Sequence, residues 1–148
     1  MKRVFRVLSL FVMIGALASL TACKKDNASS IIGKWSFEKA DIELSTDDAE
    51  IQAWFDEYMD EFMEELNDEF KGIVFEFKED NTCIVSYPAD EDDEAFSYTT
   101  EYSVEGDILT LDGDDVTIKT LNNKKLVLEM VDEDDDYSLV ETLEFKRM

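Results

Sequence analysis

The chain has 148 residues, a formal net charge of −23 at pH 7 and an apolar fraction of 45%. This length allows one compact domain with a hydrophobic core, and the strong negative charge excludes nucleic acid as a partner, because like charges repel. The chain has no histidine, which removes the usual general base of serine and cysteine hydrolases and the commonest zinc ligand.

The N-terminus predicts export. A basic start precedes an apolar run from Val7 to Leu20, which is too short to span a membrane and is typical of a secretory signal. The sequence "LTAC" at 20–23 lies where cleavage is expected, and it resembles the lipobox of bacterial lipoproteins. That resemblance implies removal of residues 1–22 and lipidation of Cys23, with a polar tether over 23–30. An ordinary signal with a chance cysteine is the alternative.

Residues 31–148 predict an all-β domain. Short apolar segments, several with alternating polarity, are separated by turn-forming runs rich in Asp, Asn and Gly. The eight predicted strands are 31–44, 72–77, 82–87, 96–104, 108–111, 116–121, 126–131 and 137–148. Because nearly every connection has hairpin length, an eight-stranded up-and-down antiparallel barrel is favoured over a Greek key. The interior of such a barrel is either filled by side chains or holds one small ligand.

One long amphipathic helix is predicted over 47–71, after the first strand. Its nine large apolar residues share a face, and its opposite face carries eight carboxylates. Six like-charge pairs four residues apart cost about 1–3 kcal/mol, whereas burial of the apolar face contributes on the order of 10–20 kcal/mol. The helix is therefore expected to form only when it docks on an apolar surface. Acidic residues near 47 would cap its start, and Gly72 would end it.

The segment "IIGKWSF" carries a Gly-x-Trp motif at Gly33 and Trp35, at the start of the first strand. With the eight strands that follow, the chain resembles lipocalins, and in particular the small lipocalin-like lipoproteins of Bacteroidota. The resemblance implies that Trp35 packs across the closed base of the barrel beneath a cation, here Arg147 or Lys146. The C-terminal helix of typical lipocalins is missing.

The helix after the first strand is similar to the helical insertion of the fatty-acid-binding proteins. That resemblance implies a helix across the open mouth, with its apolar face as a roof over the interior and its carboxylates in solvent. A helix packed on the outer wall is the alternative. The Arg-x-Tyr anchor that fatty-acid-binding proteins use for a carboxylate has no match near the C-terminal "EFKRM".

Two functions remain after these exclusions. The first is a lipid-anchored binder of a small neutral or cationic apolar molecule, because none of the interior candidates is basic. The pocket candidates are Trp54, Phe55, Tyr58, Phe62, Phe75, Phe77, Tyr98, Tyr102, Leu128 and Phe145. The second is a non-enzymatic acidic module of the cell envelope, with a filled barrel, that meets a basic protein partner.

No phosphate-binding glycine loop, nucleophile motif or dinucleotide fingerprint is present, so we expect no enzyme activity, cofactor or metal. The acidic runs 90–94, 112–115 and 132–136 are interpreted as solvated turns, with weak Ca²⁺ binding as the alternative. Cys83, in an apolar strand, is interpreted as a buried core residue. Because Lys24, not aspartate, follows Cys23, the outer membrane is the expected location.

Overall fold

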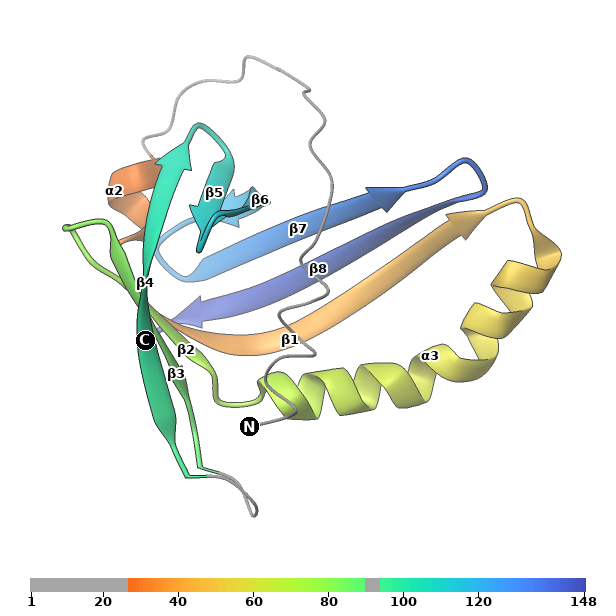
Figure 1. Ribbon diagram of the computed structural model, residues 1–148, viewed down its shortest axis with the longest axis horizontal. Coiled ribbons are helices and arrows are strands. Elements are labelled where there is room, and N and C mark those ends of the chain that lie inside the picture. The colour runs from red at the N-terminus through yellow and green to blue at the C-terminus, as the bar shows by residue number, and fades with distance from the viewer. Residues whose placement is uncertain (1–26, 90–93) are drawn as a thin grey trace.

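The computed structural model describes residues 27–89 and 94–148 and contains a barrel with one long helix beside it (Figure 1). The predicted helix and all eight predicted strands are present. The predicted signal peptide and Cys23 lie outside the described residues. The elements are α2 (Asn27–Ile31), β1 (Gly33–Thr46), α3 (Ala49–Phe70), β2 (Val74–Phe77), β3 (Thr82–Tyr87), β4 (Phe96–Glu105), β5 (Ile108–Leu111), β6 (Asp114–Leu121), β7 (Lys125–Glu133) and β8 (Tyr137–Arg147).

The eight strands form a closed antiparallel barrel in which each strand pairs with its neighbours in sequence and β8 pairs with β1. This confirms the up-and-down topology. The register of β1 shifts between Phe37 and Lys39. The extra residue lets Trp35 and Phe37 point inward before the shift and Ala40 point inward after it.

The strands of the barrel differ in length, and this difference leaves one half of the barrel open. β1 pairs with β2 only from Gly33 to Ser36, but it pairs with β8 as far as Thr46. Residues 40–46 of β1, with their partners in β8 and β7, therefore extend beyond the other strands as a three-stranded sheet (Figure 1). We call this sheet the open half of the barrel and the opposite end its base.

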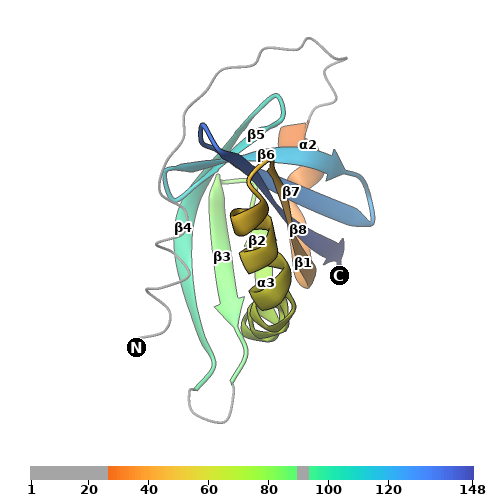
Figure 2. The same cartoon turned by 90° about the vertical axis from the view of Figure 1, so that its right-hand side faces the viewer.

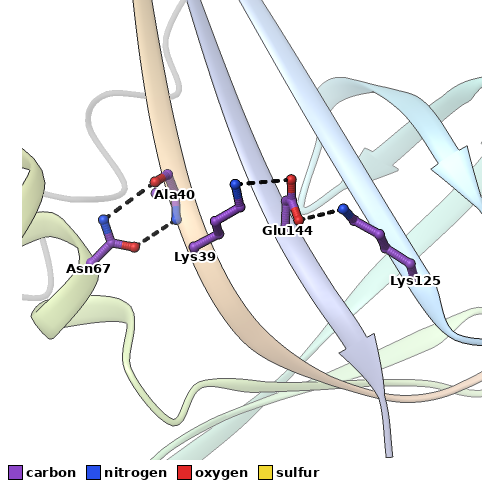
Figure 3. Close-up of polar contacts among 5 residues, drawn as sticks. All are labelled: Lys39, Ala40, Asn67, Lys125 and Glu144. Atoms are coloured by element: carbon purple, nitrogen blue, oxygen red, sulfur yellow. Dashed lines mark hydrogen bonds and ion pairs between the residues drawn. The ribbon is translucent and has the colours of Figure 1, made fainter.

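Helix α3 runs back along the free edge of β1, on the side of the barrel where β1 and β2 diverge (Figure 2). One side chain replaces the missing strand partner. The amide of Asn67 accepts a hydrogen bond from the Ala40 N–H at 2.8 Å and donates one to the Ala40 carbonyl at 3.3 Å (Figure 3). Both polar groups of an edge residue are thereby satisfied where β2 is absent.

The ends of α3 follow local chemistry. The Asp48 carboxylate accepts hydrogen bonds from the backbone N–H groups of Glu50 and Ile51, which caps the first turn. The helix ends at Phe70 with Lys71 as its C-cap, and Gly72 has a positive φ of 81° that most other residues rarely adopt. As expected, all eight carboxylates of the polar face are exposed.

α3 does not form the expected roof across the open mouth of the barrel. Only Leu66 and Phe70 of the helix are buried, and they pack at its C-terminal end against the barrel core. Trp54, Tyr58 and Phe62 are 61%, 50% and 41% exposed. The short pairing between β1 and β2 leaves a gap in the wall, so α3 lies against that edge as a side wall.

The segment before β1 also differs from expectation. Residues 27–31 form the short helix α2, whereas residues up to 30 were expected to be a tether. The Asn27 side chain donates hydrogen bonds to the Gly106 carbonyl and the Asp107 carboxylate, and Ile31 is fully buried. These contacts hold the segment on the β4–β5 turn, so the folded domain begins earlier than Ile31. In the described ranges, no helix is both long enough and apolar enough to cross a membrane.

Candidate functional site

The base of the barrel contains the motif residues. Trp35 is fully buried, and its indole N–H donates to the Ile31 carbonyl at 2.7 Å. The Arg147 guanidinium lies 4.3 Å from the centre of the Trp35 ring and donates to the carbonyls of Ser30 and Ile32. The contact expected between Trp35 and a C-terminal cation is therefore present, and the cation is Arg147.

Gly33 is required by the same arrangement. Its φ is +131°, and a Cβ placed there would lie 2.8 Å from an Arg147 guanidinium nitrogen. A larger residue would both strain the backbone and displace the cation from Trp35. Gly33, Trp35 and Arg147 therefore act together to close the base.

Half of the predicted pocket residues are core residues. Phe77, Tyr102, Leu128 and Phe145 are buried, and Phe75 is partly buried against them. The Phe75 and Phe145 rings stack with their centres 5.0 Å apart, and those of Phe77 and Tyr102 meet edge to face at 4.9 Å. The Tyr102 hydroxyl donates to the Lys78 carbonyl, and burial raises its pKa. These side chains fill the base, so they leave no room for a ligand among them.

Tyr98 of β4 packs against the periphery of this core. It points inward and is partly buried beside Tyr87, with ring centres 6.3 Å apart. Tyr87 in turn stacks on Phe96 at 4.6 Å. Burial raises the pKa of both tyrosines, so their hydroxyls stay protonated at neutral pH and can donate hydrogen bonds.

The four predicted pocket residues on α3 form a third group. Trp54 and Tyr58 contact each other, with ring centres 5.7 Å apart, and together with Phe62 they form an exposed aromatic stripe. Phe55 is partly buried. The structure thus separates the candidates into a packed base, a tyrosine group on β3–β4 and a stripe on α3.

The inner face of the open half contains residues that the sequence did not single out. Its apolar members are Ile42, Leu44, Met130 and Leu139, all of them partly buried. Glu141 lies among them, because residues 137, 139, 141, 143 and 145 of β8 all point inward. The interruption of this apolar alternation by one acidic residue is the sequence signal that could have found it.

The rim of the open half has a shallow pocket of about 300 Å³, lined by Ser45, Thr46, Asp47 and residues 133–138. None of the predicted pocket residues lines it. Its walls are acidic and polar, and the Thr46 hydroxyl donates across it to the Asp136 carbonyl. Among the described residues, no three histidine, cysteine, aspartate or glutamate side chains are placed to hold a metal ion.

Cys83 is fully buried and has no disulfide partner. Burial raises the pKa of its thiol to about 12, so the reactive thiolate is scarce at neutral pH. This confirms that Cys83 is a core residue.

A comparison with known protein families agrees with the barrel geometry. The model of the lipocalin-like domain matches residues 31–128, which is more than half of the chain. A search among curated proteins found no match. The family match covers the Gly-x-Trp motif and the strands from β1 into β7. The chain therefore belongs to the lipocalin-like domain family.

Proposed function

We propose that this protein binds a small neutral or cationic apolar ligand on the inner face of the open half, and that it does so without catalysing a reaction. One observation carries the proposal. The base is packed, whereas the inward apolar residues Ile42, Leu44, Met130 and Leu139 are only partly covered. A partly covered apolar surface beside a packed barrel core is where a small hydrophobic molecule gains from burial.

The charge of the protein restricts the charge that a ligand can carry. No lysine or arginine is among the inward-facing residues of the open half, and the eight carboxylates of α3 stand in solvent beside it. An anionic ligand would be repelled on approach and would find no cation once bound. Fatty acids should therefore bind poorly.

The ligand class can be tested with matched C8 compounds. Octanoate, octanol and octylamine would compete with a fluorescent apolar reporter at low and high salt. We expect octanoate to bind weakest at both salt concentrations, and tighter binding of octanoate would contradict the proposal. Ile42→Trp should fill the inner face and abolish reporter binding, whereas Val131→Trp, at a 42% exposed position on the outer face, is the matched control and should bind normally.

We also propose that the protein is a lipoprotein of the bacterial outer membrane, of the kind found in Bacteroidota, attached through Cys23. The lipobox-like "LTAC" supports this, and stable attachment needs more than one acyl chain. Cys23→Ser should release the protein from washed membranes, and sedimentation of the variant with membranes would contradict the anchor. Separation of inner and outer membranes would test the location.

A second candidate function has its own support. Trp54, Tyr58 and Phe62 form an exposed aromatic stripe bordered by the carboxylates of α3, and a basic protein with apolar side chains would complement such a surface. In cross-linking experiments in the host, Trp54→Ser with Tyr58→Ser should reduce links to basic proteins. Phe96→Ser, which changes a 40% exposed aromatic residue on β4, should not. Equal links from both variants would contradict this function.

A further inference from the structure

Glu141 occupies the centre of the inner face of the open half. In the register of the sheet, Ile42 of β1 pairs with it on one side and Met130 of β7 on the other. Its inward neighbours along β8 are Leu139 and Leu143. A carboxylate therefore stands where the alternation of the strand would place another leucine, with apolar side chains on four sides.

This carboxylate has no hydrogen bond or ion pair with any described residue. Burial alone raises the pKa of Glu141, and no charged side chain contributes to the shift. Glu144 of the same strand, in contrast, has cationic partners. Glu144 is three residues away on the outer face, and it pairs with Lys39 at 3.5 Å and with Lys125 at 2.5 Å (Figure 3).

In the part of the chain that the structure describes, no cation of the open half points inward to balance Glu141. Lys39 and Lys125 belong to the flanking strands, but both point to the outer face. Arg147 of β8 lies at the base, where it covers Trp35. The other titratable groups with inward positions on these strands are Asp132 of β7 and Tyr137 of β8, near the rim. Neither group is cationic at neutral pH, and Asp132 raises the pKa of Tyr137. The polar face of α3 carries only carboxylates, and these are exposed.

An ionised carboxylate in apolar surroundings is unfavourable unless a cation or hydrogen-bond donor accompanies it. No hydrogen bond or ion pair of the Glu141 carboxylate links it to another element of the described structure. The side chain is nevertheless only partly buried, so a molecule that enters the open half can reach it. Its position indicates that the Glu141 carboxylate finds its partner in a bound ligand.

We propose that Glu141 is the anchor for the ammonium group of an apolar amine. The ammonium nitrogen would pair with the Glu141 carboxylate, and the hydrocarbon part would lie against Ile42, Leu44, Met130 and Leu139. This inference rests on the proposed function and names the residue and the charge that it would select. The net charge of −23 adds a long-range attraction for cations.

An amine fits better than the other partners of a single carboxylate. A divalent metal ion requires several ligands, and no three metal-binding side chains converge in the described part of the chain. An alcohol can donate one hydrogen bond but leaves the negative charge uncompensated. A primary ammonium supplies both the charge and the donors.

Octylamine and octanol provide the test, with the full-chain protein and the same fluorescent reporter. In the wild type, octylamine should bind at least about tenfold more tightly than octanol, as expected for a partly desolvated charge pair. Glu141→Gln should remove this preference, because the amide has no charge to pair with the ammonium group. Glu43→Gln removes a carboxylate from the exposed outer face of β1, next to Ile42, and should keep the preference.

The outcomes separate this inference from the proposed function. If octanol and octylamine bind equally in the wild type, or if the preference survives Glu141→Gln, the anchor is wrong while the apolar site stands. If no apolar probe displaces the reporter, the proposed function fails and the anchor fails with it. The fold of Glu141→Gln is checked by its thermal unfolding, which should be as cooperative as that of the wild type.

Discussion

Arg147 is the single residue that connects most of the base. Its guanidinium covers the Trp35 ring and donates to two carbonyls of the segment before β1, which holds that segment against the barrel. We expect Arg147→Met to lower the free energy of unfolding by about 2–4 kcal/mol, because a cation–π contact and two charged hydrogen bonds are lost. Urea denaturation measures this change. Lys146→Met, at the exposed neighbouring position, is the control, and an equal loss in both variants would contradict the assignment.

Glu144 makes the stability of the folded protein depend on pH. Its hydrogen bond with Lys125, supported by the charges of Lys125 and Lys39, lowers the pKa of its carboxyl below the ordinary value of 4.5. A lowered folded-state pKa means that this stabilisation is present above pH 4.5 and is lost as the pH falls through the folded-state value.

Glu144→Gln should therefore destabilise the protein at pH 7 by about 0.5–1 kcal/mol, in the range of an accessible ion-pair network. The difference from wild type should shrink between pH 7 and pH 3, because protonation of Glu144 removes the charge that distinguishes it from Gln. Chemical denaturation at the two pH values measures it. A difference that persists undiminished at pH 3 would show that Glu144 acts through packing and not through charge.

At the scale of elements, α3 is held against β1 by the packing of Leu66 and Phe70 and by the side-chain amide of Asn67. Asn67 satisfies both the N–H and the carbonyl of Ala40, so it is the polar link between the helix and the edge of β1. Asn67→Asp keeps the acceptor but replaces the donor with a charge that faces the Ala40 carbonyl. We expect a loss of about 1–3 kcal/mol in unfolding free energy. Asp68→Asn, at the next and exposed position, should cost far less, and equal losses would contradict this role.

The charge pattern of α3 makes a separate prediction for the helix alone. A peptide of residues 47–71 should be mostly unfolded at pH 7, because its like-charged neighbours repel and it has no surface on which to dock. Its helical content by circular dichroism should rise when the carboxylates are protonated at pH 3. Helical content that is already high at pH 7 and insensitive to pH would show that docking is not what forms α3.

At the scale of the whole molecule, the net charge of −23 opposes the compact state through self-repulsion. Salt screens this repulsion, so raising NaCl from low concentration to 0.5 M should raise Tm by about 5 °C, equivalent to roughly 1 kcal/mol. Scanning calorimetry measures the shift. A fall in Tm would mean that the ion pairs on the outer face, such as Lys119 with Glu129, outweigh the general repulsion.

The sequence determined the elements and their order. Alternating apolar residues and turn-forming runs mark the eight strands, and hairpin-length connections leave an up-and-down barrel as the simplest arrangement. The burial of Trp35 and its contact with a C-terminal cation were implied by the resemblance to lipocalins at the Gly-x-Trp motif, together with the adjacency of the first and last strands. These features are local, or they follow from closure of the barrel, so a pattern along the chain is enough to predict them.

The tertiary structure alone decided where α3 lies and which residues stay accessible. β2 is only four residues long, so the free edge of β1 accepts the helix as a side wall, and no periodicity in α3 carries that information. The same uneven strand lengths fill the base with Phe75, Phe77, Tyr102 and Phe145 and leave Glu141 on a partly covered face. Burial depends on how far each neighbouring strand extends, and that is set by pairing between segments far apart in the chain.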